Sequence, residues 1–498
     1  MIKKSFFTVG LLLLVLFAFL LLPNREITLI IFAIAFVSSA YFLALISWWR
    51  KKSHEEVRRR VSPVIALLSL FFLSLPFIFG AFLFFLQPLN LSSVSFAIST
   101  AGFALTLFYD FLNIPLALYH KHREEELEKQ PIREYPLVSI IVPAHNEEKC
   151  IEGTIESLLE INYPNKEIII VDDGSTDRTY ALASMYIPKG VKVLHRSRGG
   201  KWAALNYGIL FSKGEIIVTI DADSLISRTA LIEIVKRFQD PRVKAVCGNV
   251  KVLNRNNLLT KCQALEYIAD INIAKRAFDI VGSTMVVPGV LGAFRRDVLV
   301  STGTYDPDTV TEDFDVTIKA LKTGAVVQTT RQACAYTEVP ETLKDLYRQR
   351  SRWYKGTAQV LIKHRDALLH PTFGFLSFLG FPYVLLSIIF IPLCGVLALT
   401  SGIIASLTGN AIPFLQLLSL FILMELLFSI LAIQLDGEDM KLALYSPLFV
   451  VGYRHFRDII RIKSLIEVVI DMALKKKRVE WRRVERKGIW REKVAKVA

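Results

Sequence analysis

The chain has 498 residues, of which 52% are hydrophobic and only 21% are charged, and its mean hydropathy is +0.41. This composition is too apolar for an ordinary soluble protein and indicates a membrane protein. The net charge is +14, and the excess of Lys and Arg lies beside the apolar stretches and in the C-terminal tail. That placement favours membrane topology over nucleic-acid binding. The five cysteines form no metal-ligand pattern, and their odd number favours a reduced cytosolic face over a disulfide framework.

Four membrane-spanning helices are expected within residues 1–120, because uncharged stretches there reach the roughly 20 apolar residues that a span requires. Their expected positions are 5–23, 27–49, 62–86 and 93–115. The loop between the second and third spans carries two basic clusters, whereas the next turn is uncharged. The positive-inside rule therefore places this loop, the N-terminus and the domain that follows on the cytoplasmic side.

A second apolar block predicts two further spans within 371–440, at about 378–402 and 411–434. The apolar run that follows is too short to cross a bilayer before Arg and His residues interrupt it. Segment 441–474 is therefore expected to be interfacial or re-entrant. The basic tail, 475–498, is expected to be cytosolic.

The region between the apolar blocks, 121–370, mixes charges freely and is long enough for one α/β core, which is expected at 137–339. Apolar runs of strand length alternate with helical stretches, which predicts a parallel sheet with helical crossovers. The expected elements are strands at 138–143, 167–171 and 215–220 and a helix at 147–159. Two strands end in acidic pairs, Asp172 with Asp173 and Asp221 with Asp223. Ligands of open α/β sheets bind beyond the carboxyl ends of the strands, so these pairs are expected to share one crevice.

Six short motifs resemble, in order and spacing, those of the inverting family 2 glycosyltransferases. They are PAHNEE (143–148), VDDGSTD (171–177), GGKWAALN (199–206), DAD (221–223), TEDFD (311–315) and QRSRW (349–353). The last two are similar to the processive membrane branch, which holds cellulose, chitin, hyaluronan and poly-N-acetylglucosamine synthases. The resemblance covers roughly 137–365. It implies a GT-A nucleotide-sugar-binding domain, with a mixed sheet and helices on both faces, inserted between α-helical transmembrane segments.

The acidic pairs and one lysine are the candidate donor site. Carboxylates at a strand end offer hard oxygen ligands to Mg²⁺ or Mn²⁺, although an isolated DxD is more often a solvated turn. The resemblance implies that Asp223 binds the metal, that Asp221 contacts the nucleotide, and that Asp172 or Asp173 holds the uracil and ribose. The alternative for the latter pair is a cap on the following helix. Lys201 opens a helix after two glycines, a place that suits a phosphate, and the resemblance agrees.

The resemblance also supplies a candidate base and acceptor site. Asp313 matches the family's general base, which takes the proton of an acceptor hydroxyl in a single displacement with inversion. As a structural alternative, this carboxylate is an acidic N-cap. Gln349, Arg352 and Trp353 share one face of an amphipathic interface helix expected within 340–370. They suit an acceptor platform, whereas Trp353 alone is more often a membrane-interface anchor.

Three further features leave alternatives open. The sequence PGVLG (288–292) departs from the Ser-Gly-Pro type of acceptor-side loop of chitin and hyaluronan synthases, so the acceptor is not fixed. Asp110 and Glu425 lie in apolar sequence, where acids are costly. Either they line a channel or they pair with Arg454 or Arg457.

The sequence therefore predicts a metal-dependent, multi-pass membrane glycosyltransferase with a cytoplasmic catalytic domain. It would extend a β-linked polysaccharide from a UDP-sugar, with UDP-N-acetylglucosamine favoured and UDP-glucose second, and pass the product across the membrane. One alternative is transfer of a single sugar to a polyprenyl or dolichyl phosphate lipid, and a distant one is an inactive scaffold or transporter. Expected partners are the donor, a polysaccharide or lipid-linked acceptor, the bilayer and a small membrane subunit.

Overall fold

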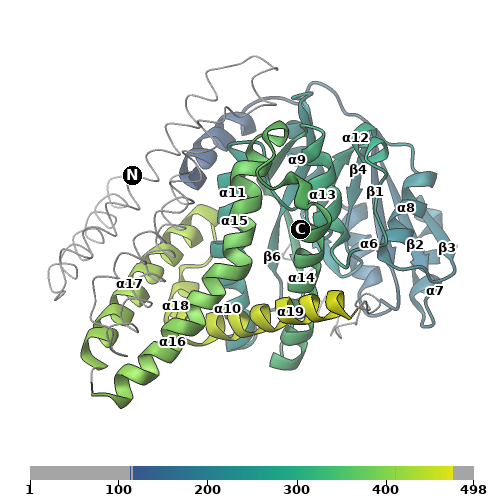
Figure 1. The fold of residues 1–498 in the computed structure, drawn as a ribbon. Helices are drawn as coiled ribbons and strands as arrows, with labels where there is room; N and C mark the ends of the chain where they lie inside the picture. The colour runs from purple at the N-terminus through teal and green to yellow at the C-terminus, as the bar shows by residue number, and fades with distance from the viewer. Residues whose placement is uncertain (1–112, 114–115, 410, 475–498) are drawn as a thin grey trace.

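The computed structural model describes residues 113, 116–409 and 411–474. The four expected N-terminal spans, Asp110 and the basic tail lie outside these residues, apart from Asn113 near the end of the fourth span. The described part is an α/β domain joined to a group of long helices, which lie together on one side of it (Figure 1). An eight-stranded sheet forms the centre of the domain, in the order β3-β2-β1-β4-β7-β6-β8-β5.

The first half of the sheet is parallel, as the alternation of strands and helices predicts. Its strands are β1 (Val138–Ala144), β2 (Lys166–Asp173), β3 (Val191–Arg196) and β4 (Ile216–Thr219). The helices between them are α6 (Ile151–Leu159), α7 (Thr179–Ser184) and α8 (Lys201–Phe211). Neighbouring residues Ile140 and Ile141 are both fully buried, because helices cover both faces of the sheet.

The second half makes the sheet mixed. Its strands are β5 (Ser224–Ile226), β6 (Val243–Val252), β7 (Gly292–Arg295) and β8 (Val326–Thr337). Strand β7 runs antiparallel to both of its neighbours, and β5 runs antiparallel to β8. The helices of this half are α9 (Ala230–Phe238), α12 (Arg296–Ser301) and α13 (Glu312–Lys322).

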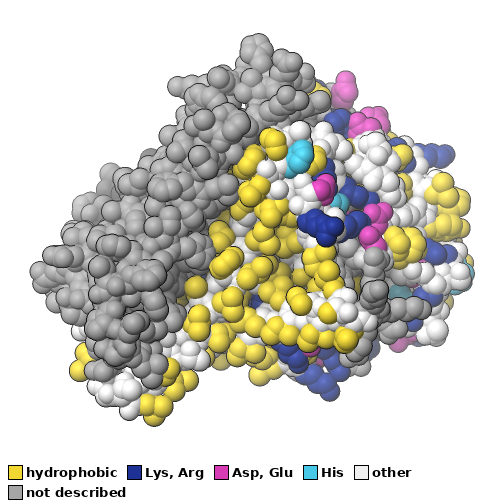
Figure 2. All heavy atoms as spheres, viewed as in Figure 1, with side chains coloured by type: hydrophobic (Ala, Val, Ile, Leu, Met, Phe, Trp, Pro, Cys, Tyr) yellow, Lys and Arg dark blue, Asp and Glu magenta, His cyan; other side chains and the backbone are white. Residues whose placement is uncertain are grey.

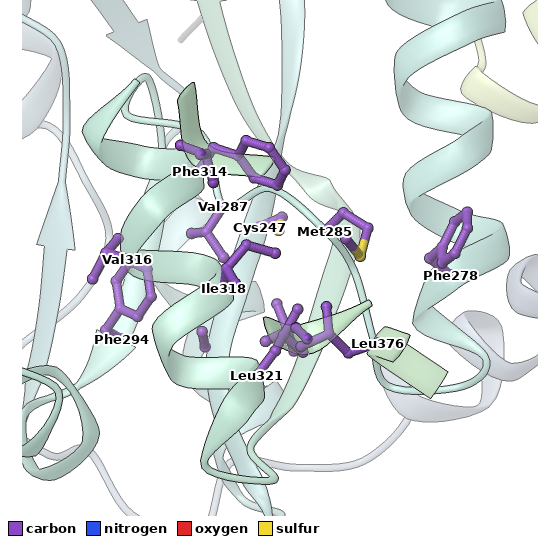
Figure 3. Close-up of a cluster of buried hydrophobic side chains, with 14 of the residues drawn as sticks. Cys247, Phe278, Met285, Val287, Phe294, Phe314, Val316, Ile318, Leu321 and Leu376 are labelled. Carbon is purple, nitrogen blue, oxygen red and sulfur yellow. The ribbon is translucent and has the colours of Figure 1, made fainter. Parts of the chain in front are cut away.

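Two apolar cores fill the two faces of the sheet. On one face, α6 and α9 pack against the strands. On the other, α8 and α13 pack against them, and Figure 3 shows Phe314, Ile318 and Leu321 of α13 beside Cys247 and the 285–287 loop. Leu376, from the region after the domain, joins the same cluster, so the domain and the long helices share a core.

Helices from two parts of the chain lie beside the sheet (Figure 1). Before β7 lie α10 (Leu258–Leu265), the π-helix η2 (Glu266–Asn272) and α11 (Ile273–Asp279). After β8 come α14 (Leu343–Lys363), α15 (Phe381–Leu385), α16 (Ile391–Leu407) and α17 (Ala411–Asp436). Two helical stretches, Leu376–Leu407 and Phe414–Asp436, are long and apolar enough to cross a membrane by length and composition. They fall where the two C-terminal spans are expected.

The chain beyond α17 turns back onto the domain. Short helices η7 (Met440–Tyr445), α18 (Ser446–Leu448) and η8 (Phe449–Arg454) lead into α19 (His455–Ala473). Helix α19 crosses α14, and its exposed side chains form an apolar face that Figure 2 shows continuing over α15. That face includes Ile459, Ile466, Val469, Ile470 and Met472. The interfacial placement of 441–474 stays a prediction.

Glu425 illustrates how an acid is accommodated in this apolar region. Its side chain is buried and forms an ion pair with Arg454, whose guanidinium also lies over the ring of Phe421. Of the two alternatives for Glu425, the structure therefore shows the pairing. Arg457 has other partners, Glu266 and Asp270.

Candidate active site

The loops after β1 and β2 form one interlocked rim at the carboxyl end of the sheet. His145 Nδ1 lies 2.9 Å from the backbone oxygen of Asp173. Asn146 has a positive φ of 57°, and its side-chain oxygen accepts a hydrogen bond from the backbone N–H of Thr176 at 2.7 Å. Asparagine tolerates this left-handed conformation better than most residues. The rim therefore holds the ends of both strands in one fixed arrangement.

The two carboxylates that end β2 differ in their surroundings. Both oxygens of Asp173 accept backbone hydrogen bonds, from Gly199 at 3.0 Å and from Gly200 at 2.7 Å. Gly200 has a φ of 96°, which only glycine adopts readily, so Asp173 fixes the turn that leads into α8. Asp172 is 1% exposed, and its Oδ2 lies 2.7 Å from His195 Nδ1. Its Oδ1 is buried without a hydrogen-bond partner in the described part of the chain.

Lys201 brings two distant motifs together. Its Nζ lies 2.7 Å from Asp221 Oδ1, just after β4, and 3.1 Å from Glu312 Oε1, at the start of α13. Burial alone would lower the pKa of Lys201, but Asp221, Glu312 and Asp313 outweigh burial and raise it. The lysine therefore stays charged at physiological pH and balances a group of carboxylates.

Gly289 lies in the PGVLG segment noted in the sequence, but its place beside Asp313 and Lys201 was not predicted. Its backbone N–H donates to Asp313 Oδ2 at 3.3 Å. A Cβ atom at this position would lie only 2.6 Å from Lys201 Nζ and 3.5 Å from Asp221 Oδ1. The glycine thus allows the 288–292 loop to approach the lysine. The sequence feature that could have indicated this close approach is the Pro288-Gly289 pair shortly before a short strand.

Asp313 has the electrostatic character of a base. Burial and the neighbouring charge of Glu312 raise its pKa to about 6, although Lys201 and two backbone N–H groups act in the opposite direction. One of those N–H groups belongs to Phe314 and lies 2.8 Å from Asp313 Oδ1. A carboxylate with this pKa is mostly ionised at pH 7 and is a stronger base than an ordinary aspartate.

The turn after β4 presents two carboxylates. Asp223 is 8% exposed and accepts a hydrogen bond from Ser224 Oγ at 3.3 Å, and Asp221 is the partner of Lys201. Thr154 of α6 fixes the turn by donating to the backbone oxygen of Ala222 at 2.8 Å. These hard oxygen donors fit Mg²⁺ or Mn²⁺.

The three expected acceptor residues lie on α14, with Gln349 buried and Arg352 and Trp353 partly exposed. This helix contacts the segment before Glu312, because Gly356 lies so close to Thr311 that a Cβ would clash with it. Gln359 also accepts a hydrogen bond from the backbone of Val310 at 3.3 Å. The start of the TED motif is therefore held against α14, one to two turns after the QRSRW motif.

Residues 139–302 match the family model of glycosyl transferase family 2. The domain belongs to this family. A poly-beta-1,6-N-acetyl-D-glucosamine synthase of Staphylococcus aureus (strain COL) is 32% identical over 243 residues, 48% of this chain and 59% of that protein. The enzyme of the same description from Staphylococcus epidermidis is 32% identical over 231 residues, 45% of this chain and 56% of that protein. The chain thus spans less than two thirds of the length of these curated relatives.

A solved structure shows the fold of the family 2 domain. It is a mannosyltransferase from Pyrobaculum calidifontis in complex with GDP-Man and Mn²⁺, which is 20% identical with a TM-score of 0.51. The alignment covers 78% of this chain and 100% of that one. The expected GT-A fold is therefore confirmed.

A second acidic group in the family 2 domain has a lysine at its centre. Oxygens of Asp306, Asp308 and Asp315 lie within 4.8 Å of one another, as the ligands of a metal ion would. Lys363 Nζ lies 2.7, 2.8 and 2.9 Å from them, and His364 Nε2 lies 2.9 Å from Asp315. The ammonium group already supplies the positive charge, so this cluster ties the loop before α13 to the end of α14.

Replacing Lys363 with methionine is expected to lower the Tm of the purified protein by several degrees at pH 7. Burial would raise the pKa of Asp315, but hydrogen bonds from His364 and Lys363 outweigh burial and lower it. This stabilisation is present above the ordinary Asp pKa of about 4 and is lost as pH falls through the folded-state value. The Tm gap from wild type should therefore shrink below about pH 4.

The matched control for Lys363 is Lys244→Met, which breaks an ion pair with Asp297, a side chain that is 66% exposed. Exposed pairs contribute about 0–1 kcal/mol, so this variant should melt close to wild type. Equal Tm values for the two variants would contradict a structural role for the Lys363 cluster.

Proposed function

We propose that this chain is an inverting glycosyltransferase that adds sugars from UDP-N-acetylglucosamine to a growing β-linked polysaccharide. The observation that carries this proposal is the contact of Lys201 with Asp221 and Glu312, which joins the candidate donor site to Asp313. Similarity to the two staphylococcal poly-beta-1,6-N-acetyl-D-glucosamine synthases favours N-acetylglucosamine over glucose.

At the donor end, Lys201 and Asp221 would orient the nucleotide diphosphate. Asp172 would hold the nucleoside, because it retains a buried oxygen without a partner in the described structure. Asp173 would act through the glycine turn that it fixes, rather than on the uracil and ribose directly. Asp223 would hold Mg²⁺ or Mn²⁺. When bound, the metal neutralises charge that develops on the departing diphosphate.

At the reaction centre, Asp313 would remove the proton of an acceptor hydroxyl. The hydroxyl oxygen forms a bond to the anomeric carbon while the bond from that carbon to the phosphate oxygen breaks and UDP departs. One base on the face opposite the leaving group gives inversion, hence a β-linkage from an α-linked donor. Gly289 supports this role, since its N–H orients Asp313.

At the acceptor end, Trp353 would offer a flat surface to the terminal sugar, and Gln349 and Arg352 would donate hydrogen bonds. The two apolar helical stretches and the exposed apolar face of α19 support an integral membrane location. We propose a multi-pass topology with a cytoplasmic catalytic domain, passage of the polymer across the bilayer and a small membrane partner subunit.

The function is tested by incubating membranes that contain the protein with a panel of labelled UDP-sugars and sizing the products. The expected result is a high-molecular-weight polymer from UDP-N-acetylglucosamine. A polymer formed from UDP-glucose alone would show that the transferred sugar is glucose. A single labelled sugar on an extractable lipid would show that the protein is a lipid-phosphate transferase and not a synthase. The absence of UDP release from every donor would indicate an inactive scaffold.

Asp223→Ala is expected to abolish metal-dependent turnover, with a smaller loss for Asp221→Ala, because the diphosphate loses its counter-charge. Mn²⁺ binding by electron paramagnetic resonance and UDP release with and without EDTA measure the effect. Asp297→Ala removes a carboxylate that is 66% exposed and serves as the control. Full activity of the wild type in the chelator would disprove the metal assignment.

Asp313→Asn is expected to lower transfer about 100-fold or more while donor binding persists, because the amide keeps the shape but takes up no proton. Only the ionised carboxylate is a base, so wild-type turnover should fall about tenfold per pH unit below its pKa of about 6. Calorimetric donor binding and a pH profile of turnover test both points. If both transfer and binding match wild type, another carboxylate is the base.

Trp353→Ala is expected to shorten or eliminate the polymer while hydrolysis of the donor to UDP and free sugar survives. Stacking on the ring and the desolvation that accompanies it contribute roughly 1–3 kcal/mol together, so acceptor retention should weaken about 5 to 150-fold. Product sizing beside a UDP-release assay separates the two outcomes. Trp353→Phe keeps an aromatic surface and should show a milder loss. Full-length polymer from the alanine variant at the normal rate would make Trp353 a membrane anchor only.

A further inference from the structure

We propose that Arg350 and Glu266 are positioning residues that set the orientation of Gln349 and Trp353 and attach them to the C-terminal segment 449–473. This inference rests on the proposed function, since it assumes that the two oriented residues bind the acceptor. Neither Arg350 nor Glu266 would contact the sugar. They would act by holding the acceptor platform in place.

Arg350 holds both platform residues at once. Its side chain is fully buried between Gln349, whose side-chain oxygen accepts from its Nη1, and Trp353, whose ring centre lies 4.1 Å from its Cζ. Its other nitrogens donate to Glu266, from Nε at 3.2 Å and from Nη2 at 2.7 Å. A planar guanidinium can form this fork and stack on a ring together, whereas a lysine ammonium cannot.

Glu266 is the point where four elements meet. Glu266 is the first residue of the π-helix η2, and its carboxylate forms ion pairs with Arg350 of α14 and, at 2.9 Å, with Arg457 of α19. It also accepts a hydrogen bond from the hydroxyl of Tyr453 in η8. Burial alone would raise the pKa of Glu266, but Arg350 and Arg457 outweigh burial and lower it to about 2. Asp270, 2.7 Å from Arg457, supplies a second negative charge. The negative charges of these two acids therefore balance the positive charges of Arg350 and Arg457 in this network.

Helix α19 also contacts α14 beyond this network, where the two helices cross. Ser464 Oγ lies 3.2 Å from Ser351 Oγ, and the guanidinium of Arg461 lies 4.7 Å from the ring centre of Tyr354. These contacts fix the helix, whereas Arg350 contacts Gln349 and Trp353 directly. Replacing buried ion pairs by apolar groups often leaves stability unchanged or higher, so a role in precise geometry explains the network better than stability does.

The primary test is Arg350→Lys in the full chain, which keeps the charge but removes the fork and the planar stack. The readout is sugar incorporated into polymer per UDP released, with mean product length and the donor KM. The ratio is expected to fall about tenfold, because a displaced platform presents the acceptor poorly. The donor KM should match wild type, since the donor site is elsewhere.

The matched control is Arg237→Lys in α9, which removes the same kind of group from a buried pair with Glu124 at 2.8 Å. It should leave the ratio at the wild-type value. Tyr453→Phe is the second variant, because it deletes a single hydroxyl that donates to Glu266 and leaves the packing intact. Its ratio is expected to fall about two- to threefold, the lower end of the effect of one hydrogen bond, because the ion pairs of Glu266 with Arg350 and Arg457 remain.

Wild-type ratios in both Arg350→Lys and Tyr453→Phe would overturn the inference, as would an equal fall in Arg237→Lys. If Arg350→Lys does not fold, the ratio of Tyr453→Phe decides alone. Failure of the proposed function has a different signature, because the wild type itself would then make no polymer from any UDP-sugar.

Discussion

Charge balance around Lys201 is the constraint on which the site depends. Three carboxylates, Asp221, Glu312 and Asp313, lie close enough to influence one ammonium group. Without that cation they would repel one another, and the carboxyl end of β4 could not approach the start of α13. The same lysine opens α8, whose preceding turn is fixed by Asp173. Lys201 therefore connects α8 and the end of β4 to the start of α13.

Much of the fold could be predicted from the sequence, because buried parallel strands are apolar runs that are bounded by polar residues. The strand expected at 138–143 occupies Val138–Ala144, and the following helix starts later than expected, at Ile151 rather than 147. The reason is the left-handed Asn146, which is followed by a turn. The antiparallel β7 was not predictable, because four residues carry no periodicity and their direction follows from tertiary pairing.

The candidate site, like the fold, was predictable from the sequence only in part. Motif spacing placed Lys201 and Asp221 correctly at element ends, where they meet. It could not show that Asp173 is occupied by backbone amides, nor that Glu266 lies against Arg350, since 84 positions separate them. Contacts between distant segments depend on packing, which leaves no local pattern in the sequence.

The π-helix η2 makes chain length, as well as residue type, a sensitive property of this region. A π turn holds one more residue than an α turn, and α10, η2 and α11 run on continuously from 258 to 279. Loss of one residue there would rotate everything downstream by about 100°. Arg276 would leave Asp436, and Asp279 would leave His120. Related chains are therefore expected to keep the residue count of this helix as well as the charged residues that it positions.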